Sequence, residues 1–355
     1  MLERISDFER VCIPPSSTIR EALEKLAWGG QAVFVVEKGT HRLSASVSDG
    51  DIRRALLNGA QLHESVLRHA NRDPITLPAN LCDEVIESQM RRSAVRVIPL
   101  LGSDRKVLAF AFNSTRESVT PARPNHFMVM AGGRGQRLNP YTEDCPKPML
   151  ELNGKPMLHH IVDRARSCGF VNFIFSVNYL KELIEEYFGD GSNFGVSISY
   201  IYEDSPLGTA GALGYAQIPG ELPVLVTNGD VMSEIDYGAL LDYHNQHGAE
   251  ATMAVRQVIE KLEYGVVQTT GRAIVKIEEK PEVSRFINAG VYVLNSEVYG
   301  GLEPGRHADM PDLFTCAIEA GLNTVAYPVH EQWIDVGRPT DYEFAERVLK
   351  KWVHI

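Results

Sequence analysis

From residue 127 onward, short apolar runs alternate with helical patterns, and this alternation constrains the fold more than any other feature of the chain. The runs "HFMVMAGG", "NFIFSVNY", "VSISYIYE" and "LPVLVTNGD" predict strands, whereas "MLHHIVDRARSCG" and "LKELIEEYFGDG" predict helices. The stretch "PLGTAGALGYAQ" is expected to turn into a further helix. Such a series predicts an α/β fold with a mostly parallel sheet covered on both faces, and with ligands beyond the carboxyl ends of its strands.

The first of these strands enters a loop that holds three glycines and two arginines in six residues, Gly132 to Arg137. Ten residues further on, Lys147 stands between two prolines. Glycines let backbone N–H groups approach phosphate oxygens, and Arg137 with Lys147 would neutralise a triphosphate. The loop lacks the Lys-Ser/Thr pair of a Walker A loop and the third glycine of a dinucleotide-binding loop. It therefore predicts a different kind of nucleoside triphosphate site.

The stretch "AGGRGQRLNPYTEDCPKPMLELNGKPML" closely resembles the signature of the sugar-1-phosphate nucleotidyltransferases. The resemblance covers residues 126 to about 350, and "PLGTAG", "NGD", "EYGVV", "EEKP", "NAGVYV" and "WIDVGRP" follow in the order of that family. It implies a Rossmann-like, GT-A-like domain with a mixed, mostly parallel sheet. It also implies a reaction in which the phosphate of a sugar 1-phosphate attacks the α-phosphorus of an NTP, with Mg²⁺ as cofactor and pyrophosphate as leaving group.

The resemblance assigns a role to residues in each motif. The catalytic residues would be Arg137, Lys147, Asp230 and Lys280. The nucleotide-binding residues would be Ala131, Gly132, Gly133, Gly135, Glu203, Gly208 and Thr209. The sugar-phosphate-binding residues would be Tyr264, Gly265, Glu279, Lys280, Asn288 and Gly290, and the Mg²⁺ ligands Asp230 and Asp335. Taken singly, Asp230, Lys280 and Asp335 also fit a turn, a surface lysine and a helix cap; it is their joint order that favours the catalytic interpretation.

Glu203 bears on which nucleotide is used. A carboxylate only accepts hydrogen bonds, and guanine offers two adjacent donors, whereas thymine offers one donor between two acceptors. Glu203 therefore favours GTP, with UTP or dTTP as the alternative. The sugar phosphate stays open among glucosamine, mannose and heptose 1-phosphate. The combination of domains resembles enzymes that make NDP-sugars for glycan or nonulosonic-acid synthesis.

Residues 1–120 predict a separate α+β region with an internal repeat. A helix, two strands and a helix recur about 65 residues apart, and such a small unit needs a second copy to bury its apolar faces. This region resembles a pair of CBS domains, a Bateman module, in which Ser48 and Asp51 would be a possible ligand site. The same residues fit a helix capping box, and the two interpretations are compatible. The resemblance implies a homodimer or higher homo-oligomer through this pair. Residues 121–125 are the predicted linker, and 126–355 the transferase domain.

Composition excludes several other classes. The net charge of −11 argues against nucleic-acid binding. The sequence lacks a signal peptide and an apolar run that could span a membrane, and its five cysteines contain no CxxC pair, so we expect a cytoplasmic protein. A non-catalytic, nucleotide-sensing regulatory subunit is a further alternative. The presence of every charged motif residue argues against it.

Overall fold

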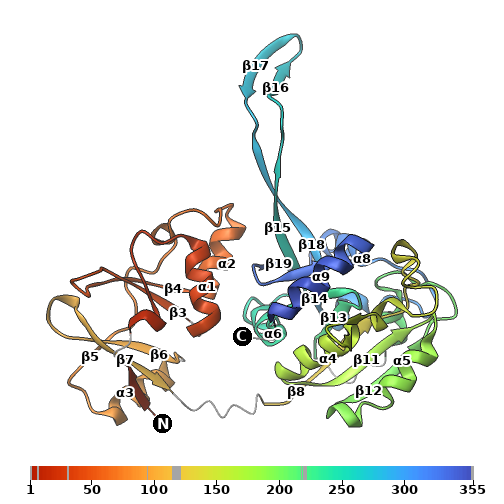
Figure 1. Cartoon of the computed structure of the whole chain (residues 1–355), viewed down its shortest axis with the longest axis horizontal. Coiled ribbons are helices and arrows are strands. Elements are labelled where there is room, and N and C mark those ends of the chain that lie inside the picture. Colours follow the sequence, from red (N-terminus) through yellow and green to blue (C-terminus); the bar gives the residue numbers. More distant parts are fainter. Residues whose placement is uncertain are drawn as a thin grey trace. The chain divides into compact units, whose positions relative to one another are not determined.

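The chain divides into an N-terminal unit, Met1–Val119, and a C-terminal unit, Thr120–Ile355 (Figure 1). The computed structural model describes residues 2–5, 8–29, 32–93, 95–113, 121–216, 218 and 222–352. Over these residues, every helix is too short or too polar to cross a lipid bilayer. All five cysteines are free thiols.

The N-terminal unit consists of two copies of one strand–helix–strand–strand motif. The first copy contains β2 (Cys12–Ile13), α1 (Ile19–Gly29), β3 (Ala32–Val36), β4 (Leu43–Ser48) and the following α2 (Asp49–Leu57). The second contains β5 (Leu77–Pro78), α3 (Asp83–Arg92), β6 (Val97–Leu101) and β7 (Val107–Asn113), with β1 (Leu2–Ile5) paired to β7. In both copies the first strand is parallel to the second, and the second is antiparallel to the third. The helix expected after β7 lies outside the described residues.

The two copies bury apolar residues against each other. Phe34 and Val36 of the first copy share one buried cluster with Val97 and Phe110 of the second, and the rings of Phe34 and Phe110 lie 5.1 Å apart. This shared cluster provides the burial that each small copy lacks alone.

Ser48 and Asp51 form the capping box at the start of α2. The Ser48 hydroxyl accepts a hydrogen bond from the Asp51 amide and donates one to Asp51 Oδ2, at 3.2 and 2.7 Å. The helix capping box that the sequence analysis gave as one interpretation of this pair is therefore present in the structure. A ligand-binding role for the pair stays a prediction.

The C-terminal unit is built on a seven-stranded sheet in the order β12-β11-β8-β13-β18-β15-β19. Of these seven strands, β18 alone runs against the others. The strands are β8 (Arg123–Met130), β11 (Phe170–Val177), β12 (Ser197–Tyr202), β13 (Val224–Asn228), β15 (Ala251–Lys261), β18 (Glu282–Leu294) and β19 (Thr324–Val329). The helices are α4 (Met157–Ser167), α5 (Lys181–Phe188), α6 (Tyr237–Gln246), α7 (Ser296–Tyr299), α8 (Met310–Glu319) and α9 (Pro339–Trp352).

Both faces of this sheet are buried, as the sequence predicts. Alternate residues of β8 point to opposite faces: Phe127 and Val129 join a core with α4, α5 and α6, whereas Met128 joins a core with α7 and α8. A mixed, mostly parallel α/β sheet is thus confirmed.

Two local predictions differ from the structure. "PLGTAGALGYAQ" forms a single 3₁₀ segment, η7 (Gly211–Tyr215), rather than an α-helix. Gly211 and Gly214 there pack so closely on the 302–308 backbone that a Cβ would lie 2.6 and 3.0 Å from carbonyl oxygens. In addition, β8 begins at Arg123, inside the predicted linker. Pro124 is tolerated because it stands near the first residue of the strand, where the ladder to β11 is irregular.

A long hairpin arm leaves the sheet between β15 and β18 (Figure 1). The two strands pair from Ala251 opposite Leu294 out to Lys261 opposite Glu282, with an irregularity between Met253 and Val255. Beyond them, β16 (Val266–Thr270) pairs with β17 (Ala273–Glu278) to form the tip. We call residues 256–287 the arm; the sequence analysis did not predict it.

Candidate active site

The glycine loop after β8 opens onto a cavity of about 480 Å³. The lining comprises Gly132, Gly133, Arg134, Gly135, Gln136, Arg137, Lys147, Pro206, Asp230 and Gly337. Gly135 has φ +64°, and a Cβ there would come within 3.0 Å of Lys147 Cβ. The left-handed backbone and this close approach both require glycine, so the loop lies directly against the lysine that follows it in sequence.

Asp230 and Asp335 are brought together by a small two-stranded sheet. β14 (Val231–Ser233) pairs antiparallel with β20 (Trp333–Asp335), with Val231 opposite Asp335, and the Val336 amide donates to the Asp230 carbonyl oxygen at 3.1 Å. Desolvation and then the negative charge of Asp230 raise the pKa of Asp335, against the opposing effects of Lys147 and Arg137. Four of the predicted catalytic and metal-binding side chains therefore influence one another at one place.

Lys147 forms an ion pair with Asp230, with Lys147 Nζ 2.5 Å from Asp230 Oδ2. Lys147 is buried, with 7% of its surface exposed, so the pair is only weakly screened by water. The other carboxylate oxygen, Asp230 Oδ1, is also buried and has no hydrogen-bond partner among the described residues. An unpartnered anionic oxygen of this kind is costly unless it accepts a proton donor or binds a cation.

The two carboxylates fit a cation that takes most of its ligands from elsewhere. No group of three or more His, Cys, Asp or Glu side chains suited to a metal occurs in the described parts of the chain. Mg²⁺ is commonly bound by one or two carboxylates together with water and substrate phosphates. The donor set of Asp230 and Asp335 matches that pattern and lacks the ligands of a closed zinc site.

Glu203 lies at the end of β12, against the glycine loop. A Cβ on Gly132 would lie 2.8 Å from Glu203 Oε1. Glu203 Oε1 accepts a hydrogen bond from Ser176 Oγ at 2.5 Å, and Oε2 accepts one from the Leu207 amide at 3.2 Å. Each carboxylate oxygen can accept two hydrogen bonds, so the fixed carboxylate retains capacity for a ligand donor.

Gly208 and Thr209 contact the segment that precedes α8. The Thr209 amide and hydroxyl donate to Asp309 Oδ1 at 3.0 and 3.2 Å, and the Met310 amide donates to Thr209 Oγ1 at 2.8 Å. A Cβ on Gly208 would lie 2.6 Å from the Ala308 carbonyl oxygen. Of this loop, Pro206 lines the cavity.

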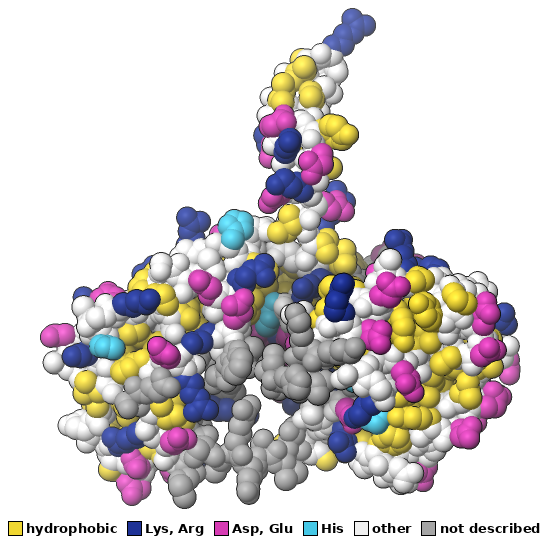
Figure 2. All heavy atoms as spheres, viewed as in Figure 1, with side chains coloured by type: hydrophobic (Ala, Val, Ile, Leu, Met, Phe, Trp, Pro, Cys, Tyr) yellow, Lys and Arg dark blue, Asp and Glu magenta, His cyan; other side chains and the backbone are white. Residues whose placement is uncertain are grey.

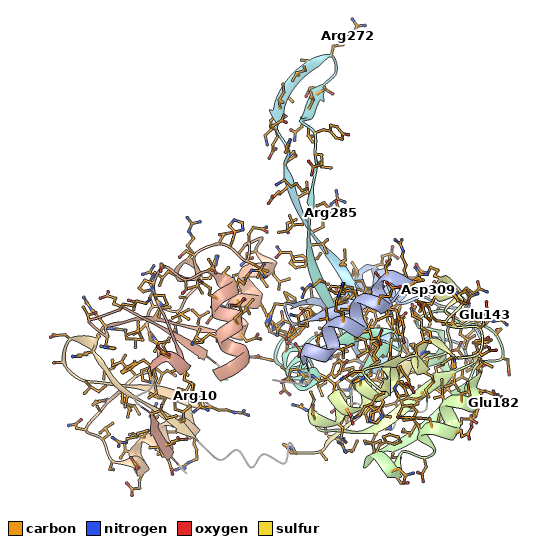
Figure 3. The ribbon with its side chains drawn as sticks, in the orientation of Figure 1. Arg10, Glu143, Glu182, Arg272, Arg285 and Asp309 are labelled. Carbon is orange, nitrogen blue, oxygen red and sulfur yellow. The ribbon has the colours of Figure 1, made fainter. Side chains whose placement is uncertain are left out.

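Asp309 is a residue that the sequence analysis missed, and it is labelled in Figure 3. The available signal was an Asp just before Met-Pro, which marks a helix N-terminus. That signal predicts a cap. It gives no indication that the carboxylate holds a loop 100 residues earlier in the chain.

The predicted sugar-phosphate residues fall into two groups. Asn288 and Gly290 lie at the base of the arm, where Gly290 has φ +73° and a Cβ would lie 2.9 Å from Asn228 Nδ2, next to the strand end that carries Asp230. Tyr264, Gly265, Glu279 and Lys280 lie on the arm itself. All six residues are absent from the cavity lining, and on the arm Tyr264 is 81% exposed. The structure therefore does not gather the six residues into one site within one chain.

Comparison with known proteins supplies two family matches. The family described as "Nucleotidyl transferase" matches residues 126–351, and the CBS domain family matches residues 5–58. The resemblance to a nucleotidyltransferase domain is thereby confirmed, as is a preceding CBS domain at residues 5–58; the second CBS domain of the predicted pair stays a prediction.

Curated relatives include mannose-1-phosphate guanylyltransferases from distant organisms. The Schizosaccharomyces pombe protein is 34% identical over 224 residues, which are 61% of this chain and 61% of the relative. The Mycobacterium tuberculosis protein is 35% identical over 224 residues, which are 61% of this chain and 62% of the relative. The chain thus spans about three fifths of the length of the curated relatives it matches.

Two solved structures are similar in fold. One is a protein from Bacillus anthracis described as a glucose-1-phosphate thymidylyltransferase, with TM-score 0.52 and 25% identity over 63% of this chain and 94% of that one. The other is HddC from Yersinia pseudotuberculosis, with TM-score 0.50 and 25% identity over 63% and 99%.

Proposed function

Because the chain belongs to the nucleotidyl transferase family through residues 126–351, we propose that it joins GTP to a sugar 1-phosphate and releases pyrophosphate. The observation that carries the proposal is the arrangement of Lys147, Asp230 and Asp335 beside the glycine loop. It combines backbone N–H groups, buried cationic charge and paired carboxylates in one cavity. These are the groups that phosphoryl-type transfer requires.

The proposed mechanism assigns each group a task. The backbone of Gly132 to Gly135 and the side chains of Arg137 and Lys147 bind the triphosphate and neutralise the charge that develops on pyrophosphate. Asp230 and Asp335 would hold Mg²⁺, which supplies neutralisation of the reacting phosphates when bound. The sugar phosphate is already ionised near neutral pH, so the reaction needs no general base. The protein's task is to align two anions that repel each other.

Two observations support GTP as the nucleotide. Similar proteins carry the name mannose-1-phosphate guanylyltransferase. Glu203 is fixed beside Gly132, where a base above the glycine loop would present its donors. Mannose 1-phosphate is the first acceptor to test, followed by glucosamine and heptose 1-phosphates. We place the reaction in the cytoplasm, consistent with the five free cysteines.

The direct test is pyrophosphate release from GTP, ATP, CTP, UTP and dTTP against those three sugar phosphates. We expect turnover with GTP that depends on Mg²⁺ and stops when EDTA is added. Preference for UTP or dTTP would instead establish the pyrimidine-using alternative. Binding of GTP without turnover for any pair would favour a regulatory subunit.

A further inference from the structure

The arm exposes large apolar side chains along its whole length. Among them are Ile259, Val267, Ile274, Val275, Ile277 and Phe286, of which Ile274 and Ile277 are both 63% exposed. Figure 2 shows these apolar atoms interspersed with charged ones on the projecting hairpin. An isolated two-stranded hairpin is marginally stable in water, and exposed apolar surface marks a contact site. The arm therefore has the properties of a segment that binds another surface.

A short junction in the arm concentrates polar and aromatic groups. We call residues 262–265 together with 279–281 the waist, because they connect the β15–β18 ladder to the tip. A Cβ on Gly265 would lie 2.7 Å from Glu279 Oε2, so these two residues face each other across the waist. Tyr264 projects into solvent, and Lys280 has φ +46°. A left-handed backbone at a non-glycine residue costs of the order of 1 kcal/mol, and such strain is enriched at functional sites.

The β15–β18 ladder fixes the distance between the waist and the cavity of the same chain. Pairing is continuous from Val255 opposite Asn288 to Lys261 opposite Glu282. At roughly 3.3 Å per residue, the waist lies about 20 Å beyond Asn288. The ladder is irregular at its base, between Met253 and Val255; beyond that point, bending the waist back toward the cavity of the same chain would break paired hydrogen bonds of β15 and β18. A regular ladder therefore holds the waist away from that cavity.

We propose that two copies of this chain exchange arms, so that the waist of one copy closes the cavity of the other. In this arrangement Lys280 and Tyr264 of one copy approach the sugar phosphate that lies beside Asp230 and Asp335 of the second copy. A reciprocal exchange satisfies two-fold symmetry and covers both arms at once. The inference rests on the proposed function for the identity of the bound sugar phosphate. The proposed contact between copies does not depend on that function, because it is inferred from the structure of the arm.

Charge favours a second copy as the occupant. Residues 256–287 contain six Lys or Arg and five Asp or Glu, a net charge of +1. The whole chain carries −11, which leaves −12 for the remainder. The arm is thus electrostatically complementary to the rest of a second copy, and Lys280 would bring a further cation near the neighbouring carboxylates of Asp230 and Asp335.

Complementation between two inactive variants tests the exchange. Lys147→Ala disables the cavity, and Lys280→Ala disables the waist; each alone should lower turnover of GTP and mannose 1-phosphate by about 10²–10³. Chains with different affinity tags are co-expressed, and the mixed dimer is isolated by two successive purifications. Exchange leaves one of its two sites with both lysines, so we expect about half of the wild-type activity.

Other outcomes contradict the exchange. If each arm serves its own chain, both sites of the mixed dimer lack one lysine, and activity stays at the level of the single variants. A chain that sediments as a monomer at the assay concentration also overturns the proposal. Matched control variants are Lys155→Ala on the body and Lys276→Ala on the arm, both in exposed ion pairs, and a mixed dimer of these should keep full activity.

A second measurement is independent of catalysis. A photoreactive Tyr264→p-benzoylphenylalanine chain is prepared in heavy-nitrogen-labelled and unlabelled forms, and the two are mixed and irradiated. Exchange predicts crosslinked peptide pairs that combine one heavy and one light chain, with the glycine-loop region as the target; a denatured sample is the control. Crosslinks within single chains would refute it. If the wild type releases no pyrophosphate but mixed crosslinks form, the proposed function fails and the exchange stands.

Discussion

Asp335 lies beside the cavity, opposite Val231 of β14, and its surroundings affect its ionisation. Partial desolvation and the neighbouring Asp230 both raise the pKa of its carboxyl group. A raised pKa means that the folded protein binds a proton more readily than the unfolded chain does. Lys147 and Asp230 instead form an ion pair at 2.5 Å, in which the two opposite charges compensate each other. Asp230 thus has one oxygen paired with Lys147 and one buried oxygen without a partner among the described residues, and a cation bound by both carboxylates would stabilise their charged forms.

The first prediction concerns pH and metal. Because the folded-state pKa of Asp335 lies above its ordinary value, the free energy of unfolding falls as pH rises between these two values and levels off above them. At pH 7 without metal, Asp335→Asn should therefore be more stable than the wild type. Added Mg²⁺ should raise the Tm of the wild type more than that of the variant. Thermal melts at several pH values, with EDTA or Mg²⁺, measure both effects.

Exposed Glu319→Gln on α8 serves as the control and should change neither the pH profile nor the response to Mg²⁺. An equal Mg²⁺ shift in the wild type and in Asp335→Asn would remove Asp335 from the metal site.

The second prediction concerns the base. Glu203→Gln keeps an acceptor toward Ser176 or Leu207 but replaces a charged acceptor with a neutral amide. Hydrogen bonds to charged groups contribute about 1.5–3 kcal/mol, so the preference for GTP over UTP should fall by about tenfold or more. The ratio of kcat/KM for the two nucleotides measures this, with Glu182→Gln on α5 as the exposed control (Figure 3). An unchanged ratio would show that Glu203 does not contact the base.

At the level of elements, sequence periodicity predicted the helices and strands that bury one or both faces in a core. The strands around Phe127 and Val226 and the helix from Met157 are buried on alternating or helical faces, and such patterns are visible in one dimension. The arm was missed because its side chains are exposed on both faces, so no burial pattern marks where it goes. The segment from Gly211 was wrongly predicted as an α-helix. It packs closely on residues 302–308, and a sequence pattern does not reveal such a tertiary contact.

The site residues divide in the same way, into those that sequence motifs mark and those that depend on tertiary structure. The roles of the loop from Gly132 to Lys147 and of Asp230 and Asp335 were predicted from the family's motifs and stay predictions, and the structure shows these residues at or just beyond the ends of strands. The separation of Lys280 from Asn288 could not be deduced, since it depends on how far a ladder continues. Asp309 was missed because its partner, Thr209, is remote in sequence.

The third prediction concerns the junction of η7 and α8. Asp309→Ala removes the acceptor for the Thr209 amide and hydroxyl. Hydrogen bonds to charged groups contribute about 1.5–3 kcal/mol, so the free energy of unfolding should fall by about that amount, and the loop from Pro206 that borders the cavity should become less ordered. We expect a lower Tm and a higher KM for GTP, with a smaller change in kcat. Steady-state kinetics with Asp312→Ala, an exposed residue in the first turn of α8, as control would measure this split.

Asp309→Asn, which keeps one acceptor oxygen, should restore most of the KM. A variant Asp309→Ala with unchanged KM would show that the contact between Asp309 and Thr209 does not affect GTP binding.

At the level of the whole molecule, the chain contains two independent cores. Each buried cluster takes its members from one unit: the clusters around Ile19, Phe110 and Ile86 from the N-terminal unit, and those around Phe127, Met128 and Leu138 from the C-terminal unit. Units with separate cores unfold as separate cooperative transitions.

The fourth prediction follows from the separate cores. Ile19→Ala in the N-terminal unit should lower the unfolding free energy of that unit by about 2–5 kcal/mol and shift one of two calorimetric transitions. Transfer activity at a temperature below both transitions should be retained. Leu240→Ala, in the core of the C-terminal unit, should shift the other transition. A single transition shifted by both variants would mean that the two units unfold together.

The lone reversed strand β18 has a consequence for how such a chain diversifies. Since β15 and β18 are antiparallel neighbours, their connection can be lengthened or clipped in paired two-residue steps while the sheet keeps its inward and outward faces. The distance that the arm extends beyond the sheet can then change while the rest of the sheet stays the same. Under the proposed function, acceptor choice would depend on the length of the arm and nucleotide binding on the strand ends, so that the two properties could change separately.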